Sequence, residues 1–209
     1  MNSFARAERE ALCDLALEIG EDAPTLCGDW TVKDLVIHLL VRERSLVGSP
    51  GILVPALSGG TRKVSEKYAR ADLALLVDQL RKPRITWAAV GPVDALLNTA
   101  EFFVHHEDIR RAQPGWTPRT LTDGQEKMLW RVASMNGRGL VRPAGVPVVI
   151  ERADDGSTAT LRRGDDPVVI RGLPSEIVMF LYGRGQLGDL EFSGPGERVE
   201  KLKKAKLGI

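Results

Sequence analysis

Residues 93–112 read VDALLNTAEFFVHHEDIRRA, and this stretch decides how the first part of the chain is organised. Apolar residues recur in it with helical spacing and Pro114-Gly115 follows shortly, so we predict a helix that ends before the proline. Glu101 and His105 are four residues apart and therefore share one face of this helix. A carboxylate on so apolar a helix is costly to bury unless it is paired or bound to a cation.

A third polar residue, His38, lies at the edge of an apolar face in another predicted helix, which begins at about Thr31 and runs to Leu46. A Glu/His pair supplies one oxygen and one imidazole, and His38 from an antiparallel neighbour would complete three ligands. Three protein ligands leave one coordination position open, which is typical of catalytic rather than structural zinc sites. Two simpler interpretations stay open: a core histidine with one hydrogen bond, and a surface Glu–His pair.

The chain has one further histidine, His106. On a regular helix it is offset by about 100° from His105, so His105 and His106 cannot both face one metal. We interpret His106, Glu107 and Asp108 as a solvent-facing group or as side chains that support the metal ligands. A carboxylate that accepts a proton from a ligand imidazole is a common support of this kind.

The rest of the chain separates into a helical part and a part with strands. We predict further helices over residues 3–20, 62–80 and 123–140 from the spacing of their apolar residues, and a glycine-rich loop over residues 48–61. After Pro143 the apolar pattern becomes shorter. We predict four strands, over residues 146–152, 158–163, 168–170 and 190–192. We also predict two helices, one over residues 175–182 and a last amphipathic one around residues 199–205. The fold class is therefore α+β, with a helical bundle over residues 1–142 and a small α+β domain over residues 143–209.

Composition excludes several classes of function. The chain has 29 basic and 28 acidic residues and a formal net charge of +1, whereas a nucleic-acid-binding protein normally has a basic excess. No apolar run approaches the roughly 20 residues that cross a bilayer, and charged residues soon follow the N-terminus, which argues against a signal peptide. We expect a cytoplasmic protein without membrane or nucleic-acid partners, in which Cys13 and Cys27 are structural thiols.

Two segments together resemble the signatures of a known family. Residues 25–39, TLCGDWTVKDLVIHL, and residues 101–112, EFFVHHEDIRRA, resemble the mycothiol-dependent maleylpyruvate isomerase family, which belongs to the DinB-like metal-binding four-helix bundles. Residues 176–184, EIVMFLYGR, are similar to part of that family's sterol-carrier-like C-terminal domain. The resemblance covers nearly the whole chain and points to an actinobacterial branch of metal-binding proteins whose reactions are uncharacterised.

This resemblance implies a divalent metal held by His38, Glu101 and His105. Two imidazoles and one carboxylate suit zinc, with nickel or iron as alternatives. It further implies mycothiol as a co-substrate, which the metal activates as a thiolate for transfer to, or isomerisation of, a small electrophilic substrate. Arg184 is then a candidate contact for a carboxylate of the substrate or the thiol.

Two other functions remain open from the residues alone: a metal- or small-ligand-binding protein without catalysis, and a structural bundle with incidental histidines. The sequence assigns no catalytic residue beyond the metal ligands, and a monomer and a homodimer are both compatible with it.

Overall fold

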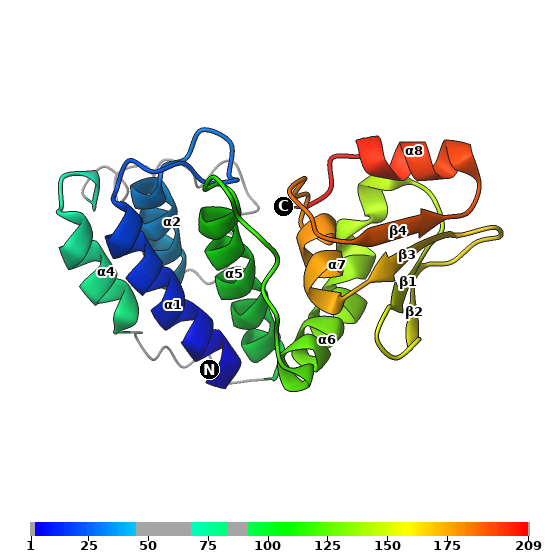
Figure 1. Ribbon diagram of the computed structural model, residues 1–209, viewed down its shortest axis with the longest axis horizontal. Helices are drawn as coiled ribbons and strands as arrows, with labels where there is room; N and C mark the ends of the chain where they lie inside the picture. The colour runs from blue at the N-terminus through cyan, green and yellow to red at the C-terminus, as the bar shows by residue number, and fades with distance from the viewer. Residues whose placement is uncertain (1–2, 45–67, 83–91, 209) are drawn as a thin grey trace. The chain divides into compact units, whose positions relative to one another are not determined.

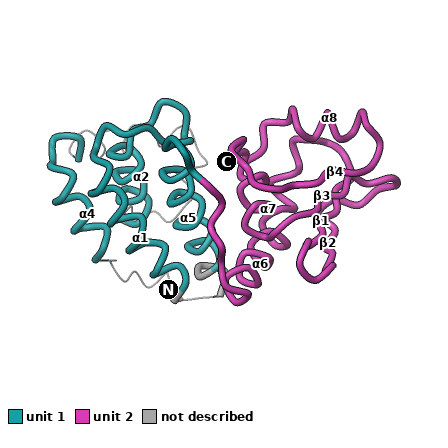
Figure 2. The backbone as a smooth tube through the Cα atoms, viewed as in Figure 1, with its two compact units in different colours: residues 1–116 teal, residues 117–209 magenta. Residues whose placement is uncertain are grey.

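The computed structural model describes residues 3–44, 68–82 and 92–208 of the chain. It divides into two units, residues 1–116 and 117–209, which Figure 2 draws in teal and magenta. The predicted boundary at residues 142/143 marks where helices give way to strands, but the division by packing falls earlier. The reason is that α6 (Asp123–Leu140) packs on α7 (Pro174–Leu181) and on β2 (Thr158–Arg162), so this helix belongs to the second unit.

Within the described part of the first unit, four helices lie beside one another (Figure 1). They are α1 (Ser3–Ile19), α2 (Val32–Arg44), α4 (Leu73–Arg81) and α5 (Pro92–Arg111). Helix α1 packs against α5 and α4, and α2 packs against α4. Their buried apolar side chains form one core, to which α2 contributes leucine, valine and isoleucine side chains on both sides of His38. The helices predicted over residues 3–20 and 93–112 are confirmed to within a residue or two.

Helix α2 begins with a reciprocal capping arrangement at Thr31, where its start was predicted. The Asp34 amide donates to Thr31 Oγ1 at 3.3 Å, and the Thr31 amide donates to Asp34 Oδ2 at 3.0 Å. These two bonds satisfy backbone donors that have no partner inside the helix. They fix where the helix starts and therefore which of its residues face α5.

Helix α4 begins later than the sequence predicts. The single helix predicted over residues 62–80 is wrong for its described part, because a turn interrupts the chain at residues 70–72. Asp72 caps the new helix by accepting a hydrogen bond from the Ala74 amide at 2.7 Å. Residues 62–67 and the loop predicted over residues 48–61 lie outside the described residues.

The described residues of the second unit contain one four-stranded sheet in the order β2-β1-β3-β4. Its other strands are β1 (Val148–Arg152), β3 (Val168–Gly172) and β4 (Leu190–Ser193). Strand β1 pairs antiparallel with β2 and parallel with β3, and β3 pairs antiparallel with β4. Helices α6 and α7 pack on each other and contact the sheet, and α8 (Gly196–Lys204) contacts β4. All four predicted strands and the α+β fold class are confirmed.

A buried carboxylate of α6 holds the first turn of α7. Glu126 accepts hydrogen bonds from the Ser175 amide and from Ser175 Oγ, both at 2.9 Å. Burial raises the pKa of the Glu126 carboxyl, although the two bonds from Ser175 act in the opposite direction.

No helix among the described residues is long and apolar enough to cross a membrane.

Candidate metal centre

The structure brings the three predicted metal ligands together. His38 lies on α2, and Glu101 and His105 lie one turn apart on α5. Glu101 Oε1 is 3.4 Å from His38 Nε2 and 3.7 Å from His105 Nε2, and the three donor atoms all lie within 4.8 Å of one another. The two imidazole rings meet edge to face, with 5.4 Å between their centres. His38 thus joins Glu101 and His105 in one group, although it lies more than 60 residues before them in sequence.

The spacing of these atoms suits a metal better than it suits direct hydrogen bonds. A tetrahedral site with ligand bonds of about 2.0–2.1 Å places its nitrogen and oxygen ligands about 3.3–3.4 Å apart. The observed separations of 3.4 and 3.7 Å are close to that value. They exceed the upper end, about 3.2 Å, of the usual range for an N–H···O hydrogen bond.

Glu101 itself provides the observation that most favours a cation at this position. Its Oε1 atom is buried and has no hydrogen-bond partner among the described residues, a costly condition for a carboxylate oxygen. Burial acts to raise the pKa of Glu101, but His38, His105 and Arg42 act more strongly in the other direction. The pKa falls to about 2, so Glu101 is ionised and available as a ligand at neutral pH.

Arg42 is the side chain that competes with a metal for Glu101. Its Nε atom lies 3.3 Å from Glu101 Oε1, and its Nη1 atom donates to Asn98 Oδ1. A simple ion pair between Arg42 and Glu101 is the alternative to a metal centre. The ion pair leaves Oε1 without a hydrogen bond and does not explain why two imidazoles lie beside Glu101. A cation would satisfy all three donor atoms.

Asp108 is the carboxylate that supports His105. Its Oδ2 atom lies 2.9 Å from His105 Nδ1, and the Asp108 side chain is fully buried. An ionised carboxylate there holds the imidazole proton on Nδ1, which leaves the lone pair of Nε2 directed toward Glu101 and His38. The sequence places Asp108 three residues after His105, so the contact follows helical spacing, but spacing alone does not select Asp108 over Glu107.

His106 and Glu107 are not solvent-facing, and that part of the sequence interpretation is wrong. His106 is buried and its Nδ1 atom lies 2.8 Å from Glu8 Oε2 on α1. Glu107 is also buried and accepts a bond of 2.6 Å from Arg111 Nε. Both side chains therefore have polar partners inside the helical unit. Glu8 lies 98 residues from His106 in sequence, so helical spacing within α5 does not reveal this contact.

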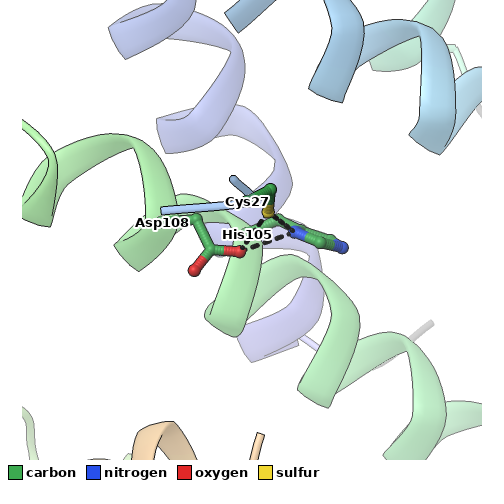
Figure 3. A group of neighbouring side chains, drawn as sticks. All are labelled: Cys27, His105 and Asp108. Carbon is green, nitrogen blue, oxygen red and sulfur yellow. Dashed lines mark hydrogen bonds and ion pairs between the residues drawn. The ribbon is translucent and has the colours of Figure 1, made fainter. Parts of the chain in front are cut away.

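The loop between α1 and α2 brings two further side chains to the group. Trp30 keeps 40% of its surface exposed, and its ring centre lies 5.1 Å from that of His38. Cys27 is half-buried, and its thiol donates to Asp108 Oδ2 at 3.0 Å and lies 3.8 Å from His105 Nδ1 (Figure 3). Cys13 differs, since it is fully buried and burial raises its pKa to about 12. Cys13 alone fits the expectation of a purely structural thiol.

Backbone contacts fix this loop to the end of α5. The Leu26 amide donates to the Asp108 carbonyl at 3.0 Å, and Gln113 Nε2 donates to the Pro24 carbonyl at 3.1 Å. Gly28 turns the chain with a φ of +64°, a conformation that favours glycine. The positions of Cys27 and Trp30 are therefore set by the helix that carries Glu101 and His105.

Arg184, the predicted substrate contact, lies in the second unit directly after α7. It donates to the Tyr182 carbonyl and lines a hollow of about 280 Å³ in the same unit. The hollow combines two cationic side chains with apolar ones; its lining includes Phe180, Arg184, Leu187, Phe192, Lys203 and Leu207. This composition suits a small organic anion that carries an apolar part.

Comparison with solved structures identifies the fold. A crystal structure of a histidine-to-alanine mutant of the mycothiol-dependent maleylpyruvate isomerase matches with a TM-score of 0.62 and 14% identity. The match covers 91% of this chain and 90% of that chain. The chain shares the fold of this isomerase. A second structure of the same isomerase matches with a TM-score of 0.55 and 16% identity over the same shares of the two chains. No family model and no curated protein sequence matches the chain.

Proposed function

We propose that the protein binds one divalent metal ion through His38, Glu101 and His105 and uses it to activate a small thiol for isomerisation or thiol transfer. The observation that carries the proposal is the buried Glu101 Oε1 atom, which has no hydrogen-bond partner among the described residues and faces two imidazole nitrogens. Zinc suits this donor set, and nickel and iron are the alternatives.

The residues of the chain prepare this chemistry in distinct ways. Asp108 keeps the proton of His105 on Nδ1, so that Nε2 is free to bind. Three protein ligands leave a position for an incoming molecule, where a divalent cation stabilises a bound thiol as its thiolate. The exposed face of Trp30 beside His38 offers an apolar surface for that molecule. Arg42 lies close enough to Glu101 to balance its negative charge.

The shared fold gives the proposal its reaction class. The isomerase with this fold is named for its dependence on mycothiol. Fold alone does not establish an activity, so the class rests on the fold together with the donor set found here. Mycothiol is therefore the thiol to test first. The hollow at Arg184 is a candidate site for a carboxylate of the thiol or of the electrophile.

Metal content tests the first part of the proposal. Protein purified without an affinity tag should hold close to one divalent ion per chain. His38→Ala and Glu101→Ala should each weaken binding by more than about 100-fold, because even the loss of a supporting residue costs about 10–100-fold. Glu10→Ala is the matched control, since Glu10 is an acidic residue that forms an ion pair with Arg81. Full metal retention in both site variants would contradict the proposal.

Titration with mycothiol separates an enzyme from a metal-binding protein without catalysis. In cobalt-substituted protein, mycothiol should change the visible spectrum of the metal, because a thiolate would enter its coordination shell. An unchanged spectrum with saturating thiol would reject the thiol-dependent reaction and leave the non-catalytic alternative. Arg184→Ala should lower the affinity for the thiol or for the substrate. It should not change the metal content, because Arg184 belongs to the other unit.

A further inference from the structure

His105 has donor groups on both sides of its ring. Its Nε2 atom faces Glu101, while its Nδ1 atom faces Cys27 and Asp108. The atoms Cys27 Sγ, His105 Nδ1 and Asp108 Oδ2 form a second group whose members lie within 4.8 Å of one another. Figure 3 shows the three side chains converging, with Cys27 approaching from the loop and the other two from α5.

We propose that Cys27, His105 and Asp108 form a second cation site, which takes a thiophilic divalent ion and competes with the first set for His105. The two sets differ in chemistry. The first offers two imidazoles and a carboxylate, whereas the second offers a thiol sulfur, which favours softer cations. The second set needs neither His38 nor Glu101, so binding there does not depend on the proposed function, whereas the competition for His105 rests on it.

The geometry needs little change to hold an ion. The separations are 3.0 Å from Sγ to Oδ2, 2.9 Å from Nδ1 to Oδ2 and 3.8 Å from Sγ to Nδ1. Metal–sulfur bonds of about 2.3 Å and metal–nitrogen or metal–oxygen bonds of about 2.0–2.1 Å require ligand separations of roughly 3.3–3.6 Å. Each separation is within about half an ångström of that range. The bond from the Leu26 amide to the Asp108 carbonyl keeps the loop and the helix together.

Protons occupy this set when no cation is bound. The Cys27 thiol and His105 Nδ1 both share a proton with Asp108 Oδ2. A cation that binds Sγ and Nδ1 replaces both protons: the thiol proton passes to solvent, and the imidazole proton moves from Nδ1 to Nε2. A neutral imidazole has a single free lone pair. His105 therefore cannot serve both sets at once, and an ion in the second set weakens the first.

Cadmium binding to the full chain tests the second site. The double variant His38→Ala/Glu101→Ala removes the first set, and Cd²⁺ should still bind one equivalent per chain with an ultraviolet thiolate-to-metal charge-transfer band. Adding Cys27→Ser should abolish the band, and adding Asp108→Asn should lower the affinity at least tenfold. Cys13→Ser is the matched control and should leave the band unchanged, because that thiol is fully buried.

Three results would overturn the second site: no band in the double variant, a band that survives Cys27→Ser, or an affinity unaffected by Asp108→Asn, which would mean binding by the thiol alone. Circular dichroism of each variant confirms that it is folded. Competition is tested in the unsubstituted protein, where Cd²⁺ should displace Co²⁺ from the first set, and in Cys27→Ser, where it should not. Failure of Co²⁺ to bind at all contradicts the proposed function but leaves the cadmium result to decide the second site.

Discussion

At the scale of single residues, His105 is the centre of the proposed chemistry because each of its ring nitrogens has its own partners. Nε2 faces Glu101 and, beyond it, His38, while Nδ1 faces Asp108. The side on which the imidazole carries its proton therefore decides whether it can bind a metal with Glu101. Asp108 holds this proton on Nδ1 without itself contacting the proposed metal position.

Asp108→Asn should weaken the first metal set by about 10–100-fold, because the amide keeps the shape of the side chain but loses the charge that holds the proton on Nδ1. Isothermal titration with Zn²⁺ or Co²⁺ measures the change in affinity. Asp78→Asn is a suitable control, since Asp78 forms an exposed ion pair with Lys82. An Asp108→Asn affinity equal to that of the unsubstituted protein would show that Asp108 does not orient His105.

The sequence predicted that His38, Glu101 and His105 lie together but not what surrounds them, for a physical reason. Glu101 and His105 follow from the regular spacing of one helix, and the family resemblance added His38. The contact of Cys27 with Asp108 joins residues 81 positions apart. Contacts of this kind depend on how a loop folds back on a helix, and no local spacing rule predicts them.

At the scale of elements, α6 lies so close to its neighbours that a Cβ atom at one of its glycines would displace leucine side chains. A Cβ atom at Gly137 would lie 2.8 Å from Leu161 Cδ1 on β2 and 3.1 Å from Leu181 Cδ1 on α7. A Cβ atom at Gly139, two residues further along the same helix, would meet nothing within 4 Å. The two positions form a matched pair within one helix.

Gly139→Ala should stabilise the protein by up to about 1 kcal/mol, because alanine is the better helix former. Gly137→Ala gains the same helical preference but must push two leucines aside, so it should be less stable than Gly139→Ala by about 1–3 kcal/mol. Urea denaturation followed by circular dichroism gives both free energies of unfolding. Equal stability of the two variants would contradict the close packing of α6.

Glu126 gives a pH-dependent prediction for the contact between α6 and α7. Because the folded pKa of this carboxyl is raised above its ordinary value of 4.5, the folded state binds a proton that the unfolded state has lost. The contribution to stability is fully present below about pH 4.5 and is lost as the pH rises through the folded pKa. Glu126→Gln should remove this contribution, so the stability difference between the two proteins should change across that window.

Denaturation of both proteins at several pH values between about 4 and 7 measures the effect, since it spans the ordinary carboxyl pKa and values above it. Glu200→Gln, an exposed acidic residue on α8, should leave the pH profile unchanged. Parallel profiles for the unsubstituted protein and Glu126→Gln would show that Glu126 is not the titrating group.

Prediction of the elements succeeded where the pattern was regular. The bounds of α6 agree with its predicted range, since Thr122 caps the helix with Gln125 and leaves a clear signal in the sequence. Helix α4 was predicted to start too early because Tyr68 and Leu73 fit one helical stripe. The cap at Asp72 divides that stripe, and the apolar spacing does not show the division.

At the scale of the whole molecule, the two units carry separate candidate sites. The first set of donors lies entirely within residues 1–116, and the hollow at Arg184 lies entirely within residues 117–209. The sequence predicted two domains but placed the boundary by the change from helices to strands. Packing instead assigns α6 to the second unit, because its buried face contacts α7 and β2.

A metal should therefore protect one unit and leave the other unchanged. With Zn²⁺ at about 100 times its dissociation constant, binding stabilises the folded state by about 2.7 kcal/mol. Hydrogen exchange measured by mass spectrometry should slow in peptides from α2 and α5, which the ion joins, and stay constant in β1–β4. Equal slowing in the sheet, or none in α2 and α5, would contradict this division.

The bond between the Leu26 amide and the Asp108 carbonyl also limits how the centre can be transplanted. Two helices copied into another scaffold would carry His38, Glu101 and His105 but would lose the loop that brings Cys27 and Trp30 to them. The smallest portable version of the centre consists of residues 24–38 together with residues 98–113. A designer who grafts this centre must treat loop and helix as one inseparable part.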